Sequence, residues 1–343
     1  MLITPLLNAI EYFYNINNKS DNDHTNSIRE NIILYVLNRE KVELGSYMKH
    51  ATYGQKWTIF INSINQVLNS ILDEFEQKLE NKIYEYDIIN IGGRKNNDFT
   101  IRVYQNDKKI EEIKLEFKNN SDQIEKLPEI CQLYENTEYV SYNSMSVKVK
   151  SSEKVVSSEK ITSYNEYYYH NIIPIIRKQF PILPEITFES YKKDVQKAGT
   201  SKNRDKYPFF KKLDEIRNTN IDYFDRTFVD KSINDWLNII CPDKICALDI
   251  KLLSNKLKQM TSKIFLMWKC DLKNINNSKF HIEKINNKDM DNIKFNSLKG
   301  GKNGKNTIIL NDCNNEYHCL LRWKNHNGIQ GTAWQIKLKK VLI

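Results

Sequence analysis

The sequence predicts an α/β fold of the α+β kind, in which a helix, three strands and a second helix precede a basic, β-rich C-terminal subdomain. Apolar residues recur every three to four positions over residues 55–82, which is the period of a helix. Three segments of strand character follow at 84–91, 98–104 and 110–118. Short apolar segments return after residue 262, separated by loops rich in Asn, Gly and Lys.

Helical character extends over residues 25–82 and is clearest from residue 55 onward. The apolar positions that define this helix are Trp57, Phe60, Ile64, Val67, Leu68, Ile71, Phe75 and Leu79. The turn-rich segment 92–97, Gly-Gly-Arg-Lys-Asn-Asn, separates the first two strands. Ser121 is a suitable N-cap for the second helix, which we expect to reach about residue 135.

The remainder of the chain has two further compositions. Residues 141–160 are rich in Ser, Lys and Val and predict an exposed, mobile connection, and prolines divide residues 164–255 into short helices. We therefore expect three segments: 1–140, the helical N-terminus with the three-stranded core; 141–261, a linker and mostly helical region; and 262–343, the basic β-rich subdomain. The strands expected in the last segment are 264–270, 280–285, 307–310, 317–323 and 332–338.

The net charge of +9 indicates an anionic partner such as nucleic acid. Residues 262–343 hold 15 Lys and Arg against 6 Asp and Glu, so this segment carries the whole surplus. A second interpretation remains open. The chain is rich in Asn, Lys and Ile and has only five Ala, as an AT-rich genome would produce, and its lysines would then be surface filler.

Six scattered cysteines without a CxxC pair are typical of reduced thiols in an intracellular protein. His318 and Cys319 beside Cys313 fit no zinc spacing. No run approaches 18 apolar residues and no signal peptide is recognisable, so we expect a soluble cytoplasmic protein without a membrane partner. The AT-rich composition also fits a viral protein in an infected host cell.

The two central strands alternate strictly between apolar and polar residues. Phe99, Ile101 and Val103 share a face with Ile113, Leu115 and Phe117, which leaves Asp98, Glu116 and Lys118 together on the opposite face. A loop centred on Asp107 brings the apolar faces into register and sets Asp98 across from Glu116. A two-residue turn at positions 107–108 would set Asp98 opposite Phe117 and bury the wrong side.

Two carboxylates at this separation repel each other unless a cation lies between them. One or two carboxylates, completed by water and phosphate, are the ligands that Mg²⁺ prefers. Lys118 could orient a water molecule or stabilise charge on a phosphate. These residue types are sufficient for phosphodiester hydrolysis.

Asp98-Phe99 at the start of one strand and Glu116-Phe117-Lys118 on the next resemble the PD-(D/E)xK nuclease superfamily, which includes many restriction endonucleases. The resemblance covers about residues 55–135 and implies a restriction-endonuclease-like core. It also implies Asp98 and Glu116 as ligands of Mg²⁺ (or Mn²⁺) and Lys118 as the catalytic lysine. Asn97 stands where the superfamily has proline.

The superfamily often adds a glutamate from the helix before the strands. Glu74 and Glu76 both border the apolar stripe of the predicted helix, and Glu76 is the preferred candidate. Gln132, on the helix expected after the strands, is a further residue that could face the site.

Cations in two regions are candidates for binding nucleic acid. Arg94 and Lys95 lie in the loop before Asp98. The C-terminal subdomain adds Arg322, Lys324, Lys337 and Lys339. Its Trp323 and Trp334 either stack on bases of a single strand or pack in the core of the subdomain.

The leading hypothesis is a Mg²⁺-dependent endonuclease acting on DNA. The alternatives are a nucleic-acid-binding or structural protein with an inactive nuclease-like fold, and an RNA endonuclease. Cleavage of both strands by an enzyme with a single site would require a homodimer, for which the sequence identifies no surface.

Overall fold

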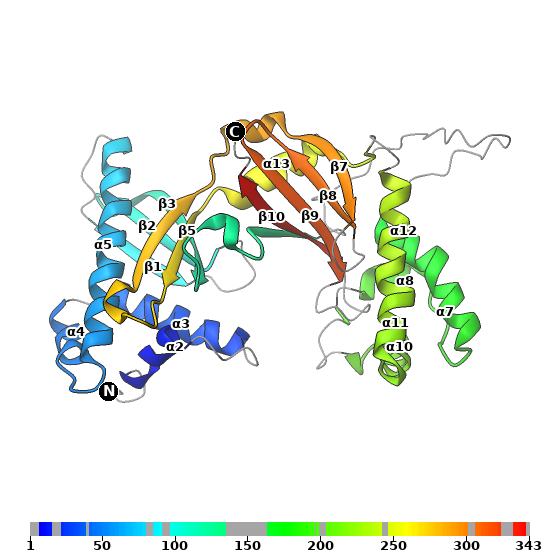
Figure 1. The fold of residues 1–343 in the computed structure, drawn as a ribbon, viewed down its shortest axis with the longest axis horizontal. Coiled ribbons are helices and arrows are strands. Elements are labelled where there is room, and N and C mark those ends of the chain that lie inside the picture. Colours follow the sequence, from blue (N-terminus) through cyan, green and yellow to red (C-terminus); the bar gives the residue numbers. More distant parts are fainter. Residues whose placement is uncertain are drawn as a thin grey trace. The chain divides into compact units, whose positions relative to one another are not determined.

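The computed structural model describes residues 7–15, 22–38, 41–79, 85–90, 97–134, 163–195, 197–198, 204–241, 246–300, 306–323 and 332–340 (Figure 1). The chain is a mixed α/β protein with two compact units, each built from two stretches of sequence. Unit 1 comprises Met1–Leu127 and Met260–Asn286, and unit 2 comprises Pro128–Gln259 and Asn287–Ile343.

Unit 1 contains helical elements, most of which precede the first strand, and a five-stranded sheet. The helical elements are η1 (Asn8–Ile10), α2 (Glu11–Tyr14), α3 (Asn22–Leu37), α4 (Lys41–Met48), α5 (Gly54–Leu79), η2 (Ile124–Lys126) and η5 (Ile275–Asn277). The strands are β1 (Glu85–Asn90), β2 (Phe99–Gln105), β3 (Lys108–Asn119), β5 (Ile264–Lys269) and β6 (Lys279–Lys284).

The strand order in this sheet is β1-β2-β3-β5-β6. The β3–β5 pair is parallel, with Glu116 beside Phe265 and Lys118 beside Met267, and the other pairs are antiparallel. The apolar side chains of β2 and β3 are buried in one core with the apolar stripe of α5 from Trp57 to Ile71, as the two sequence periods predicted. This packing leaves the polar side chains of the same strands on the opposite face of the sheet.

The β2–β3 hairpin reaches the expected register by an unexpected route. Its turn consists of two residues, Asn106 and Asp107, with φ angles of 50° and 60°. Beyond Tyr104 and Lys109 the pairing shifts by one, because Val103 pairs with Glu111 and Ile110 is an extra residue in a bulge. Phe99 then pairs with Leu115, and the apolar faces coincide. The bulge therefore supplies the parity that a loop centred on Asp107 was expected to supply.

Unit 2 has a helical part and a second five-stranded sheet. The helical elements are α6 (Tyr164–Tyr167), η3 (Tyr168–Ile172), α7 (Ile173–Gln179), α8 (Phe188–Asp194), α10 (Pro208–Thr219), α11 (Ile221–Phe224), η4 (Asp225–Asp230), α12 (Lys231–Ile240), α13 (Ile250–Thr261) and η6 (Lys288–Asn292). The strands are β4 (Cys131–Tyr134), β7 (Lys294–Gly300), β8 (Asn306–Asn311), β9 (Asn315–Trp323) and β10 (Thr332–Lys340), in the order β4-β10-β9-β8-β7.

The core of unit 2 is aromatic. Trp323 and Trp334 are each 1% exposed, so neither can stack on a base. The ring of Trp323 lies 5.7 Å from that of Tyr164, and Trp334 lies 6.2 Å from Trp236 of α12. Of the two interpretations that the sequence left open for these tryptophans, core packing is confirmed.

The prediction of a helix over residues 121–135 is wrong. After β3 the chain forms the short 3₁₀ turn η2 and then strand β4, in which Cys131 pairs with Ile336 of β10. Gln132 therefore lies on a strand of unit 2 and not on a helix beside the hairpin. The β4–β10 ladder satisfies the backbone of this segment through a partner about 200 residues away, which local periodicity cannot reveal.

The two-unit division also differs from the three consecutive segments that composition suggested. Strands β5 and β6 belong to the basic segment 262–343 of the sequence, yet they extend the sheet of unit 1. Strand β7 was not expected from the sequence, whereas β5, β6, β8, β9 and β10 were. The expected linker at 141–160 lies outside the described residues.

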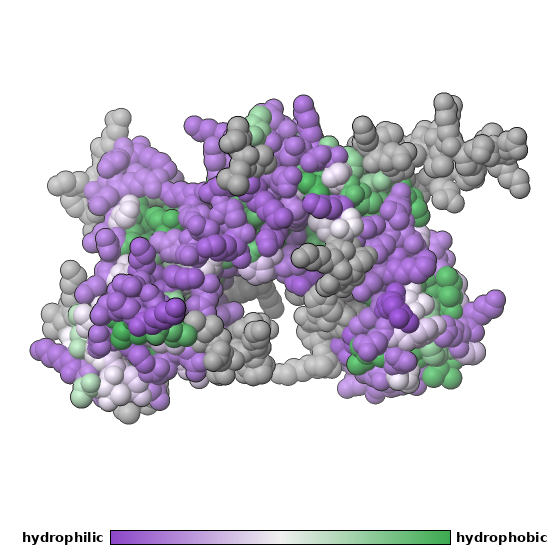
Figure 2. All heavy atoms as spheres, in the orientation of Figure 1, coloured by the Kyte–Doolittle hydropathy of each residue, from purple (hydrophilic) through white to green (hydrophobic). Residues whose placement is uncertain are grey.

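None of the described helices is both long enough and apolar enough to span a membrane. The face drawn in Figure 2 is mainly hydrophilic, with hydrophobic patches over the helical part of unit 2. The most exposed of the large apolar side chains include Ile175 and Ile182, which belong to that helical part.

The hairpin turn gives a test of the register. An L-residue with positive φ is strained by about 1 kcal/mol, and glycine is not. We expect Asp107→Gly to raise the free energy of unfolding by up to about 1 kcal/mol, and Asp107→Val to lower it by at least as much. Urea unfolding of the full chain measures both. Equal stability of the two variants would contradict the turn.

Candidate active site

Asp98 sits at the start of β2, where two backbone contacts fix it against β3. Its own N–H donates to the carbonyl of Leu115 (2.9 Å), and the N–H of Phe117 donates to its carboxylate Oδ2 (2.7 Å). One step beyond the Phe99–Leu115 pair, this register sets Asp98 opposite Glu116. The predicted juxtaposition of Asp98, Glu116 and Lys118 is therefore present.

Glu116 is held between two lysines. Its Oε1 lies 2.8 Å from Nζ of Lys118, and its Oε2 lies 3.2 Å from Nζ of Lys263. The Lys263 side chain is only 2% exposed, and Nζ also lies 5.5 Å from the ring centre of Phe265. Lys263 reaches this position because β5, which begins at the next residue, runs parallel to β3. Sequence analysis missed Lys263, since nothing local links it to a strand about 150 residues earlier.

Glu30 is the second residue that sequence analysis missed. It lies on α3, and its carboxylate interacts with Asn90 at the end of β1 and with the charges of Glu116 and Lys118. The C-terminal end of α3 is tied to β1, because Asn38 Nδ2 donates to the carbonyl of Ile88 (2.8 Å). This contact fixes the helix two turns beyond Glu30. The sequence shows a helical glutamate here, but only the packing of α3 on β1 directs it to the site.

The carboxylates of this cluster are short of compensating positive charge. Burial, followed by the charge of Glu116, raises the pKa of Asp98 to about 7, although the Phe117 N–H opposes the shift. Burial also raises the pKa of Glu30, with a further contribution from Glu116. The electrostatic cause is the same in both cases. The three carboxylates act on one another electrostatically in a poorly solvated region, and Lys118 and Lys263 compensate them only in part.

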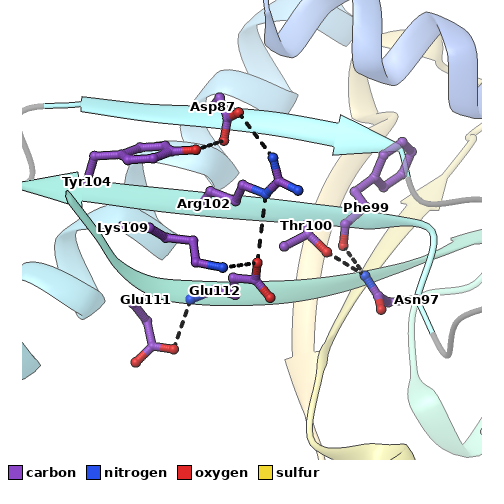
Figure 3. Close-up of polar contacts among 9 residues, drawn as sticks. All are labelled: Asp87, Asn97, Phe99, Thr100, Arg102, Tyr104, Lys109, Glu111 and Glu112. Carbon is purple, nitrogen blue, oxygen red and sulfur yellow. Dashed lines mark hydrogen bonds and ion pairs between the residues drawn. The ribbon is translucent and has the colours of Figure 1, made fainter. Parts of the chain in front are cut away.

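Asn97, which directly precedes Asp98, has a local structural role (Figure 3). Its side-chain Nδ2 donates to the carbonyl of Phe99 (2.6 Å) and to Oγ1 of Thr100 (2.9 Å). All three residues are buried. These bonds close the backbone around Asp98, so the amide stabilises the bend that precedes the strand.

Arg102 lies further along the same face of β2, between two acids (Figure 3). Its guanidinium is 3.8 Å from Asp87 of β1 and 3.7 Å from Glu112 of β3. Glu112 in turn is 2.9 Å from Nζ of Lys109. Arg102 is thus matched by carboxylates and is a weak candidate for binding phosphate.

The carboxylate oxygens of Asp98 and Glu116 are of the chemical type that binds a divalent cation. Asp98 Oδ1 has no hydrogen-bond partner among the described residues, and its carboxylate faces the charge of Glu116. In the described part of the chain, no three His, Cys, Asp or Glu side chains converge as a ready metal site. Mg²⁺ needs only one or two protein carboxylates, however, because water and phosphate complete its shell. Asp98 and Glu116 are the residues that would hold it.

The other predicted residues are spread over the molecule. Glu76 is half-buried on α5, whereas the acids that act most on Asp98 are Glu116 and Glu30. Its role at the site stays a prediction. Arg94, Lys95 and Lys324 lie outside the described residues.

Arg322, Lys337 and Lys339 lie on one face of the unit 2 sheet. The pairing of β9 with β10 sets Lys337 against His318 and Lys339 against Glu316, and Trp323 and Trp334 point into the core on the opposite face. Arg322 is 3.9 Å from Glu129. The predicted cations that can be described therefore form a shared surface.

Neither a protein-family model, nor a curated protein, nor a solved structure shows significant similarity to this chain.

The Lys263–Glu116 contact can be tested by its coupling. Lys263→Met leaves a partly buried carboxylate with one ammonium partner fewer, and we expect a loss of about 1–3 kcal/mol in unfolding free energy. Combined with Glu116→Gln, the loss should fall short of the sum of the single losses by at least about 0.5 kcal/mol. Urea unfolding measures all three variants.

Lys269→Met is the matched control, because Lys269 is the last residue of β5, the strand that Lys263 precedes, and its side chain is 45% exposed. Its cost should stay within about 0.5 kcal/mol. Strict additivity of Lys263→Met and Glu116→Gln would show that the two side chains do not interact.

Proposed function

We propose that this chain is a Mg²⁺-dependent nuclease that hydrolyses phosphodiester bonds of DNA. The observation that carries the proposal is the grouping of Asp98, Glu116 and Lys118 at one point of the sheet. Asp98 is bonded to the backbone of β3, and Lys118 lies 2.8 Å from Glu116. Two carboxylates and a lysine in this arrangement match the residues that the PD-(D/E)xK resemblance assigns to catalysis.

The side chains divide the chemistry between them. A bound Mg²⁺ or Mn²⁺ supplies polarisation of the scissile phosphate and a bound water of lowered pKa. Asp98 and Glu116 hold the ion, and Lys118 Nζ stabilises the charge that develops on the phosphate oxygens. Glu30, whose pKa is raised by burial, can accept a proton from the attacking water through its carboxylate.

The basic face of unit 2 favours a nucleic-acid substrate. Lys337 and Lys339, which form no ion pair with another described residue, can neutralise phosphates regardless of base sequence. Arg322 would have to exchange its 3.9 Å contact with Glu129 for a phosphate. With Trp323 and Trp334 buried, the aromatic platform that would favour a single strand is missing from the described part of this sheet. Duplex DNA is therefore the substrate we propose. Each site would cut one strand, so a double break would need a second copy of the chain.

One observation favours the alternative of a nuclease-like protein that has lost its chemistry. Both carboxylate oxygens of Glu116 are engaged by lysines, and one of these lysines is buried. In an inactive protein, the lysine ammonium would take the place of the metal ion permanently. In an active nuclease, it would neutralise Glu116 only until a divalent ion binds and displaces it. Metal binding and cleavage, measured together, distinguish the two.

The central prediction concerns cleavage. Asp98→Asn, Glu116→Gln and Lys118→Met should each lower the rate of Mg²⁺-dependent cleavage of duplex DNA at least about 100-fold, because each removes a group that acts on the reacting phosphate. Glu30→Gln should lower it at least about tenfold. Plasmid, linear, single-stranded DNA and RNA substrates identify the preferred nucleic acid, and Mn²⁺ titration calorimetry reports ion binding to the wild type and to Glu116→Gln.

Glu112→Gln is the matched control, since Glu112 lies on the same strand and face but pairs with Arg102 and Lys109. It should keep full activity. Glu76→Gln compares the glutamate favoured by sequence with Glu30. Cleavage by Asp98→Asn or Glu116→Gln at the wild-type rate would remove this site from consideration. Absence of both cleavage and ion binding in the wild type would support the inactive alternative.

A further prediction concerns the basic face. Each phosphate that a cation neutralises contributes about 0.9 to the slope of log affinity against log salt. Changing Arg322, Lys337 and Lys339 together to Ala should therefore flatten this slope by about 2–3. Fluorescence anisotropy with labelled duplex DNA over a salt series measures it.

The control changes Lys178, Lys192 and Lys193 to Ala. These exposed lysines of α7 and α8 give the same loss of charge elsewhere in unit 2. If both triple variants flatten the slope equally, the effect is one of net charge. If neither does, the lysine surplus reflects the composition of the sequence.

A further inference from the structure

Arg29 on α3 carries a buried charge, and no carboxylate among the described residues is paired with it. The residue is 6% exposed. Its Nε donates to the carbonyl of Tyr12 and its Nη1 to Oδ1 of Asn26, both at 2.9 Å. These acceptors are neutral, and in the described part of the chain no Asp or Glu lies within ion-pair distance of the guanidinium. Burial lowers the pKa of Arg29.

A buried guanidinium of this kind is uncommon, because desolvating a charge is costly unless an opposite charge compensates it. Hydrogen bonds to neutral oxygens orient the side chain but leave its positive charge in place. Nη2 and the second hydrogen of Nη1 donate to no other described residue. The fold therefore holds the Arg29 guanidinium in a fixed orientation, and the described residues supply no negative charge to pair with it.

Arg29 lines a pocket of about 620 Å³ in unit 1. The other lining residues come from η1, from α2 and the residue after it, from α3 and from Tyr53. Several carry neutral polar groups, among them Asn8, Thr25 and Asn31. Glu11 also lines it, but this carboxylate is ion-paired with Lys56. The pocket thus combines one uncompensated cation with amide and hydroxyl groups.

We propose that this pocket binds a phosphate group. A guanidinium edge with neighbouring amides and hydroxyls suits an anion with several acceptor oxygens. The volume lies in the range of small-molecule sites and exceeds what a bare carboxylate needs. The group can belong to a free nucleotide or to the end of a nucleic-acid strand, since both present the same phosphate. The site stands independently of the nuclease proposal, although Arg29 and Glu30 are neighbours on one helix.

The test uses the full chain, with ligand binding followed by thermal unfolding and titration calorimetry. The probes are inorganic phosphate, adenosine 5′-monophosphate, adenosine, and a short DNA duplex with or without a 5′-phosphate, all at equal ionic strength and without divalent ions. Phosphate and the nucleotide should bind and raise the unfolding temperature, and adenosine should not. Arg29→Gln should weaken phosphate binding at least tenfold. Equal phosphate binding by wild type and Arg29→Gln would overturn the proposal.

The two sources of phosphate give different patterns. If the nucleotide binds at least tenfold more tightly than the phosphorylated duplex, the site takes free nucleotides. If the 5′-phosphate raises duplex affinity at least tenfold and Arg29→Gln abolishes that gain, the site takes strand ends.

Two further variants keep the test decisive. Arg217→Gln changes an arginine that is ion-paired with Asp225 in unit 2, and it should bind phosphate as the wild type does. Asn31→Asp introduces a negative charge at an exposed position of the pocket without removing a buried group, so it covers the case in which Arg29→Gln does not fold. It should weaken phosphate binding at least tenfold. Unchanged affinity in Asn31→Asp would place the phosphate elsewhere and overturn the assignment.

Discussion

The single-residue bulge at Ile110 is the constraint on which the candidate site depends. A two-residue turn alone would pair β2 and β3 in the other parity, which would turn Phe99 or Leu115 away from the core. The hydrophobic core rejects that pairing, because each buried aromatic or leucine side chain is worth roughly 1.5–3 kcal/mol. The extra residue restores the parity, and the same shift sets Asp98 across from Glu116. Packing on one face of the sheet thereby determines the chemistry on the other.

Around this hairpin the site gathers charges from distant parts of unit 1. Glu30 comes from α3, Lys263 comes from the start of β5, and Lys118 follows Glu116 on β3. Together with Asp98 and Glu116 they make three acids and two bases in a poorly solvated place. The two lysines do not fully compensate the negative charge of the three acids, and the pKa of Asp98 is raised to about 7 by burial and by the charge of Glu116. A site of this composition gains from a further cation, which is why we associate it with a metal-dependent reaction.

Local patterns predicted the parts of the fold that local forces determine. The stripe of α5 and the alternation in β2 and β3 were readable because their periods match the geometry of each element. The segment 121–135 was misread, because its apolar residues fit a helix and only the ladder with β10 makes it a strand. Asp98, Glu116 and Lys118 belong to one hairpin and could be found from the sequence. Glu30 and Lys263 could not, since their proximity to the site is a property of tertiary packing.

The parallel pairing of β3 with β5 has a consequence for folding during synthesis on the ribosome. Most of unit 2 is synthesised between Asn119 and Ile264, so β3 leaves the exit tunnel long before its neighbour exists. At roughly 5–20 residues per second this interval is on the order of 10 s. Throughout it, the central strand of the sheet is an unpaired edge rich in Ile, Leu and Phe, which is the kind of surface that recruits other chains. The polar face of this strand alternates Glu and Lys, from Glu112 to Lys118, and charges of this kind discourage such pairing until β5 has been synthesised.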